Sequence, residues 1–247
     1  MSDTLRPTGS DDTSGAQPLY VPIKRRSFFM YAGATAGATA LLLAGCKDDD
    51  DSSIDANTTV DVGTGDAGVL NYAYALEQLE AAFYAEVLKG SYFTGLAPAA
   101  AERQIFADIA LHEQIHADFF KTALAGNAIK ALTPNFSAIN FGDRTSVLTS
   151  ARAFEDLGVA AYNGAGRFIT DPKFLVVAGK IVSVEARHAA IIRDLIAPNS
   201  FVANDVVDFS TTSATAHQER SKLPAEVLAV ANTFLAEGSK VSAKSLV

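Results

Sequence analysis

Two copies of one glutamate–histidine pair constrain this chain more than any other feature. Glu113 and His116 are spaced E-x-x-H, and the same spacing returns at Glu185 and His188. On an α-helix, residues three apart lie on one face about one turn apart, so one carboxylate and one imidazole can reach the same metal ion. The chain has only four histidines, and this motif contains two of them. The repeated motif therefore predicts helices that meet around metal.

Two further glutamates complete a four-part order. Glu77 lies in ALEQLEAAFY and Glu155 in AFEDLGVAAY, which share an Ala, the Glu, a Leu, a second Ala and the final Tyr. The order Glu, ExxH, Glu, ExxH is the set with which a four-helix bundle holds two metals in its core. Four buried carboxylates repel one another unless cations neutralise them. Two divalent ions would do this, and Glu and His donors suit Fe or Mn, with Zn also compatible.

On this four-part motif the chain resembles the ferritin-like superfamily. More narrowly, it is similar to the desiccation-related ferritin-like proteins found behind bacterial export signals. The resemblance covers about residues 68–199. It implies terminal carboxylates, bridging carboxylates and one imidazole per metal, which are respectively Glu77 and Glu155, Glu113 and Glu185, and His116 and His188.

Apolar periodicity and turn residues predict an all-α, ferritin-like four-helix bundle over residues 67–199. Helices are expected at about 67–89, 98–126, 145–164 and 172–197, and the short links make each successive pair an antiparallel hairpin. A helix of about 20 residues is ~30 Å long, so segment 127–144 is long enough to be the crossover between hairpins. Residues 200–247 are expected to form a C-terminal extension with a short helix at 224–236. No strand is expected.

The first 46 residues are predicted to be an export leader. A basic stretch, KRRSFF at 24–29, precedes a short apolar run, which is typical of a signal peptide. The pair Arg25-Arg26 resembles a twin-arginine signal. The sequence Leu43-Ala44-Gly45-Cys46 resembles a lipobox, in which the cysteine is lipidated. We therefore expect an exported protein that is anchored in the cell envelope through Cys46, at the periplasmic face or the cell surface.

Charge and composition describe the rest of the expected organisation. Residues 47–66 include four consecutive aspartates and are rich in Ser, Thr, Asp and Gly, which predicts an acidic, disordered tether; the acidic run also resembles a surface-export signal. The net charge of −8, without a basic patch, argues against nucleic acid as a partner. No stretch after residue 50 is long and apolar enough to span a bilayer.

Four more residues are expected beside the ligands. Tyr84 and Tyr162 each follow a motif glutamate by seven residues, or two helical turns, on the same face. They either hydrogen-bond a ligand carboxylate of the neighbouring helix or simply pack in the core. Glu80 follows Glu77 by one turn but aligns with Gly158 in the repeat, so we expect it beside the ligands or on the surface. The fourth residue is His112.

His112 raises a competing interpretation, because HEQIH at 112–116 reads H-E-x-x-H, the signature of zinc metallopeptidases. That interpretation leaves the second ExxH motif and the matched glutamate segments unexplained. For a dimetal centre, the reaction stays open among ferroxidase, peroxidase and catalase chemistry with oxygen or peroxide. A non-catalytic alternative is a metal-stabilised structural protein that protects the envelope against drying or oxidative stress.

Overall fold

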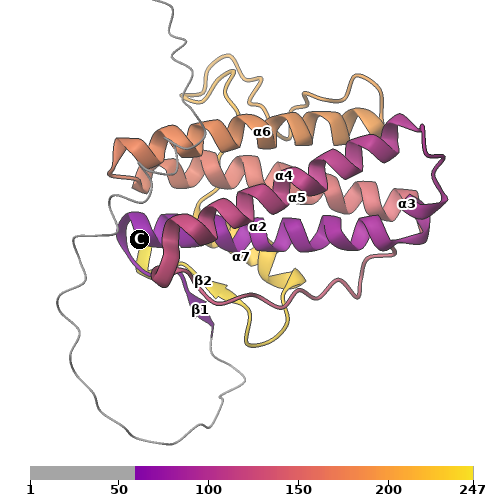
Figure 1. The fold of residues 1–247 in the computed structure, drawn as a ribbon. Helices are drawn as coiled ribbons and strands as arrows, with labels where there is room; N and C mark the ends of the chain where they lie inside the picture. Colours follow the sequence, from indigo (N-terminus) through magenta and orange to yellow (C-terminus); the bar gives the residue numbers. More distant parts are fainter. Residues whose placement is uncertain (1–58, 247) are drawn as a thin grey trace, which may run out of the picture. The chain divides into compact units, whose positions relative to one another are not determined.

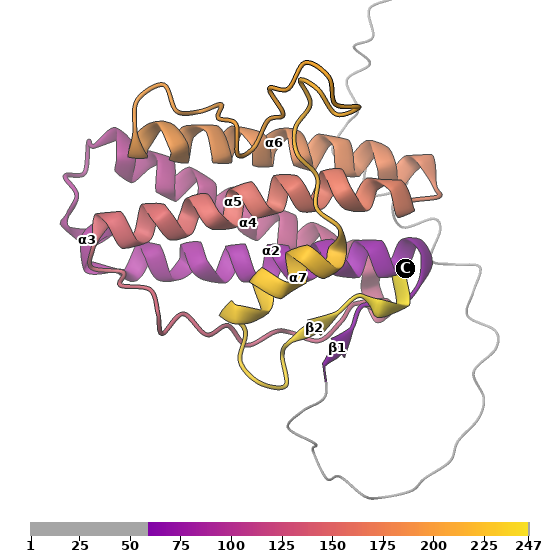
Figure 2. The same cartoon turned by 180° about the vertical axis from the view of Figure 1, so that it is seen from behind.

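Four long helices form the body of the computed structural model, which describes residues 59–246 (Figure 1). They are α2 (Gly65–Lys89), α4 (Ala101–Leu124), α5 (Arg144–Ala165) and α6 (Pro172–Ile196). α2 packs most extensively against α4, and α5 against α6, so the two predicted hairpins are present. Segment 128–143 then runs along the bundle to join them (Figures 1 and 2). The predicted all-α bundle of two hairpins is confirmed.

The helix ends follow from local chemistry. The Asp143 side chain accepts a hydrogen bond from the Ser146 N–H at the start of α5, and Asp171 accepts one from the Lys173 N–H at the start of α6. Such caps satisfy backbone donors that have no partner inside the helix. Gly90 follows α2 in an extended conformation, and a Cβ there would lie 2.3 Å from the Phe141 carbonyl oxygen. The crossover therefore passes directly against the bare backbone of Gly90.

Several predicted boundaries need correction. The expected loop after residue 90 contains a short helix, α3 (Ser91–Gly95), and the second long helix begins three residues later than predicted. The predicted helix at 224–236 is shorter, because α7 (Pro224–Ala231) gives way to a 3₁₀ turn at Asn232–Phe234. Similar 3₁₀ turns follow α4 and α5 at Ala125–Asn127 and Gly166–Phe168. Periodicity alone does not separate such a turn from the last turn of an α-helix.

The prediction that no strand occurs was wrong. β1 (Val60–Asp61) pairs in parallel with β2 (Val241–Ser242), so the last part of the predicted tether is structured. Val62 and Val241 are buried beside this pair. The sequence around Val60 and Val62 did not predict a strand, because its partner strand lies about 180 residues further along the chain. The predicted leader, Cys46 and tether residues 47–58 lie outside the described residues.

The C-terminal extension packs onto the bundle. α7 places Val227, Leu228 and Ala231 in the main core and lies against α5 (Figure 2). Arg193, on α6, is buried and forms salt bridges with Asp156 on α5 and with Asp205 in the extension. These contacts join the extension to the hairpin that it covers. Among residues 59–246, no helix is both long and apolar enough to cross a membrane.

Candidate metal centre

The six predicted ligands converge in the middle of the bundle. α2 and α5 each provide one glutamate, whereas α4 and α6 each provide a glutamate and a histidine. All four glutamates are fully buried, and the two histidines are nearly so. Helical periodicity turns these residues inward, since each lies among the buried positions of an otherwise apolar face. The buried set is Glu77, Glu113, His116, Glu155, Glu185 and His188.

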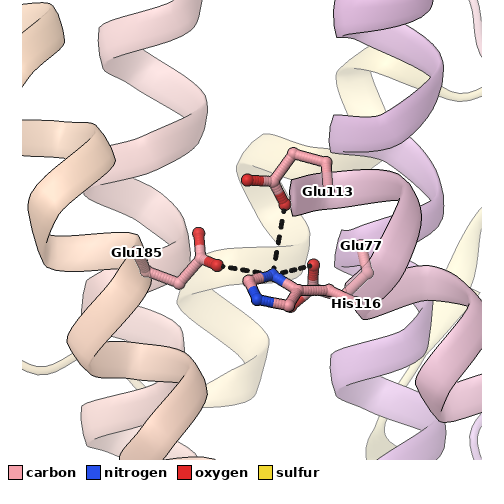
Figure 3. Close-up of side chains that lie close together, drawn as sticks. All are labelled: Glu77, Glu113, His116 and Glu185. Carbon is pink, nitrogen blue, oxygen red and sulfur yellow. Dashed lines mark ion pairs between the residues drawn. The ribbon is translucent and has the colours of Figure 1, made fainter. Parts of the chain in front are cut away.

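His116 is the centre of a first group. Its Nδ1 atom lies 2.9 Å from Glu185 Oε1, 3.3 Å from Glu77 Oε2 and 3.6 Å from Glu113 Oε2. Figure 3 shows these three carboxylates around one edge of the imidazole. One donor atom from each residue of this group lies within 4.8 Å of the others. Metal–ligand bonds of about 2 Å would span such a space around one ion.

His188 is the centre of a second group. Its Nδ1 atom lies 2.8 Å from Glu113 Oε1, 3.5 Å from Glu155 Oε2 and 4.0 Å from Glu185 Oε2. The donor atoms of this group also lie within 4.8 Å of one another. Glu113 and Glu185 therefore belong to both groups, each with one oxygen directed to either side. This is the arrangement that carboxylates bridging two ions would have.

Several buried polar atoms of both groups have no hydrogen-bond partner within residues 59–246. A buried polar atom without a partner costs free energy, and an unpaired buried charge costs more. Metal ions would satisfy all of these atoms at once, so the donor set fits a pair of cations. The atoms are both carboxylate oxygens of Glu113 and of Glu185, Oε2 of Glu77 and of Glu155, and Nδ1 of His116 and of His188.

Two tyrosines hold the remaining oxygens of the terminal glutamates. The Tyr84 hydroxyl on α2 donates to Glu155 Oε1 on α5, and the Tyr162 hydroxyl on α5 donates to Glu77 Oε1 on α2. Of the two interpretations that the sequence left open, the hydrogen-bonding one therefore describes the structure. Each bond leaves the glutamate's other oxygen directed at its group. The bonds also link one hairpin to the other.

The protonation equilibria show what the groups do without cations. Burial alone would lower the pKa of His116, but the carboxylates of Glu113, Glu185 and Glu77 around its Nδ1 atom raise it to about 12. Burial likewise lowers the pKa of His188, but the nearby carboxylates of Glu113 and Glu155 outweigh burial and raise it to about 10. Burial raises the pKa values of Glu77, Glu155 and Glu185. Protons therefore occupy this centre when metals do not, and metals must displace them.

His112 lies at the edge of the centre. Its Nδ1 atom is 2.9 Å from Nε2 of His188, and the two rings stack with centroids 5.1 Å apart. Because Nε2 of His188 faces His112, its Nδ1 faces the carboxylates. His112 belongs to neither donor group. A zinc peptidase would need it to bind the same ion as His116, so this geometry does not support that alternative.

Glu80 is where the sequence was least informative. The structure buries its side chain on the bundle's inner side, so the surface alternative was wrong. The signal that could have shown this is its spacing, since three residues place it one turn from Glu77 on the same face. Alignment with Gly158 drew attention away from Glu80, because the repeat has no second carboxylate there.

A helical bundle with two carboxylate–histidine groups that share two glutamates defines a class of metal-binding four-helix proteins. The chain belongs to the ferritin-like domain family, whose model matches residues 65–198, more than half of the chain. This match contains all four long helices and ends before the C-terminal extension. A search of the curated proteins found no match.

Proposed function

We propose that this protein binds two divalent ions of Fe or Mn and uses them in redox chemistry with dioxygen or peroxide. The observation that carries the proposal is the convergence of buried donor atoms that lack partners, in two groups that share Glu113 and Glu185. Carboxylate and imidazole donors suit Fe and Mn. Zn would also fit the donors but would not supply redox chemistry. When bound, two adjacent redox ions would exchange electrons with oxygen or peroxide.

The chain's own contribution is to place donors and exclude water. Glu113 and Glu185 would set the separation of the ions because each belongs to both groups. Tyr84 and Tyr162 hold the terminal glutamates from the opposite hairpin. Since all four ligand carboxylates are fully buried, their interactions with cations would be much stronger than in water.

A small apolar cavity supports a substrate such as dioxygen. It measures about 30 Å³ and is lined by α2, α4, α5 and α6 side chains that include Ala73, Phe120 and Tyr162. Apolar cavities of this kind favour small uncharged molecules over ions. Tyr162 connects the cavity wall to Glu77 through its hydroxyl.

The non-catalytic alternative uses the same metals for stability. Metal-free, the centre holds like charges in a buried space, so bound cations would stabilise the folded protein whether or not they react. Turnover of peroxide or uptake of oxygen by the metal-loaded protein separates the two functions. The stress-protective role, against drying or oxidative damage, belongs to either.

We further propose that the protein is exported and lipid-anchored in the cell envelope. Support comes from the Arg25-Arg26 pair, the apolar run after it, and Leu43-Ala44-Gly45-Cys46. Fractionation of cells that produce Cys46→Ser tests the anchor. We expect a released protein or an uncleaved precursor, and a cleaved Cys46→Ser chain that stays on the membrane would contradict the proposal.

Metal analysis of the purified full chain tests the principal proposal. Protein produced with Fe or Mn in the medium is expected to hold two ions per chain, measured by elemental analysis. Loaded protein is then mixed with hydrogen peroxide, and its disappearance is followed. Protein without metal would contradict the dimetal function, and two tightly bound ions with no reaction toward oxygen or peroxide would favour the structural alternative.

A further inference from the structure

Glu80 is a buried carboxylate that the six-ligand arrangement does not use. Its side chain is 4% exposed, and it makes no hydrogen bond or ion pair with any of residues 59–246. Glutamate is almost never buried in this way unless it is paired or bound to metal. A buried carboxylate of this kind is neutralised either by a proton or by a bound cation.

Gly158 provides the space for this carboxylate. A Cβ at position 158 would lie 3.0 Å from Glu80 Oε1 and 3.7 Å from Glu185 Oε2. Glu80 and the bridging Glu185 therefore approach the same bare stretch of α5. After burial, the negative charges of Glu185, Glu113, Glu77 and Glu155, in that order, raise the pKa of Glu80.

The Glu185 oxygen that lies beside Gly158 belongs to the second donor group. Glu185 Oε2 is the oxygen that faces His188, at 4.0 Å from its Nδ1 atom. Along α2, Glu80 lies one turn before Tyr84, which holds the Glu155 of that group. Glu80 lies outside both four-residue groups, so its buried carboxylate would have to turn away from Gly158 to reach an ion there.

We propose that Glu80 is a seventh metal ligand, which adds a fifth carboxylate to the centre at the position of His188 and Glu155. The inference rests on the proposed dimetal function. This seventh ligand makes the two metal positions unequal, because the position in the α5–α6 hairpin that corresponds to Glu80 is a glycine, Gly158. The second position would therefore hold its ion with one more oxygen donor than the first.

Mn²⁺ titration of metal-free full chain tests this proposal, with binding measured by calorimetry and by the electron paramagnetic resonance signal of free Mn²⁺. The variant is Glu80→Gln, which keeps the shape and removes the charge. The matched control is Glu86→Gln, a half-exposed glutamate on the same helix that forms a salt bridge with Lys89. We expect Glu80→Gln to lose more than about 100-fold in affinity at one position, beyond the range of a residue that acts through another ligand.

The thermal unfolding of the metal-free variant distinguishes a ligand from a structural residue. We expect Glu80→Gln to unfold at the same or a higher temperature than the wild type, because a buried carboxylate is removed. A variant that is unfolded or less stable without metal would overturn the proposal, as would two ions bound within about 100-fold of wild-type affinity. Wild-type protein that binds no Mn²⁺ or Fe²⁺ would instead overturn the dimetal function itself.

Discussion

The two hairpins of the bundle build the same half-site with different neighbours. His116 of the α2–α4 hairpin lies 2.9 Å from Glu185, and His188 of the α5–α6 hairpin lies 2.8 Å from Glu113. Each imidazole is thus closest to the shared glutamate of the opposite hairpin. Because every contact in one group has a counterpart in the other, the approximate two-fold relation is kept wherever metals would bind.

The hairpins differ at positions that flank those donors. Glu80 corresponds to Gly158, and His112 corresponds to Val184. Both extra polar groups come from the α2–α4 hairpin, yet His112 contacts His188 and Glu80 shares the Gly158 surface with Glu185. Two polar side chains of the α2–α4 hairpin, His112 and Glu80, thus lie against the α5–α6 hairpin. The equivalent positions of the α5–α6 hairpin, Val184 and Gly158, carry no polar side chain. A repeat can keep a symmetric donor set while its surroundings become unequal.

The largest effect is expected from the shared glutamates. Glu113→Gln and Glu185→Gln each remove a charge that both groups use, so each should reduce binding from two ions to one or none. Elemental analysis of both variants, with Glu86→Gln as the control, measures this. Two ions retained in either variant would show that the hairpins do not share that carboxylate.

A pH dependence is expected next. The raised pKa values of His116, about 12, and His188, about 10, mean that both imidazoles carry protons at neutral pH. Each bound ion must displace a proton, so metal affinity should rise with pH, by about tenfold per unit for each proton released. Mn²⁺ titrations between pH 6 and 8 measure this slope. An affinity that is constant over this range would contradict the protonated imidazoles.

His112 provides a smaller test of the difference between the hairpins. Replacing it with Ala removes the group that orients Nε2 of His188, and such partners typically contribute about 10- to 100-fold in metal affinity. The matched control is Val184→Ala at the equivalent position, for which we expect little change. The loss should affect one of the two ions, as resolved in the Mn²⁺ titration. Equal losses of metal affinity in His112→Ala and Val184→Ala would show that His112 does not make the two hairpins different.

The tyrosines should change stability rather than the difference between the two metal positions. Tyr84→Phe and Tyr162→Phe each remove one hydrogen bond to a buried glutamate, and bonds to charged groups contribute about 1.5–3 kcal/mol to stability. Chemical denaturation of the metal-loaded variants measures the free energy of unfolding. The two losses should be similar because the bonds are equivalent. A much larger loss in one variant would indicate that the hairpins differ here too.

The sequence was most informative where spacing determines geometry. Residues three apart on a helix must share a face, so Glu113 with His116 and Glu185 with His188 could be placed before any coordinates were known. The length of the crossover likewise determined the connection between hairpins. These inferences are local, or depend on the reach of the chain alone.

Features that depend on distant partners were not accessible in this way. The spacing of Glu80 from Glu77 places it on the inner face of α2. The space for its carboxylate, however, exists because position 158 on α5 is a glycine. The contact of His112 with His188 joins residues 76 apart in the sequence. The short strand at Val60–Asp61 is defined by a partner at the other end of the chain.

That strand pair has a consequence for synthesis. β1 leaves the ribosome about 180 residues before β2, so their hydrogen bonds cannot form until Val241–Ser242 has been made. A chain terminated before Val241 would leave the Val62 N–H without its acceptor on Ser242 and the start of α2 without its cover. The packing at the start of α2 therefore depends on residues that are made about 180 positions later in the chain.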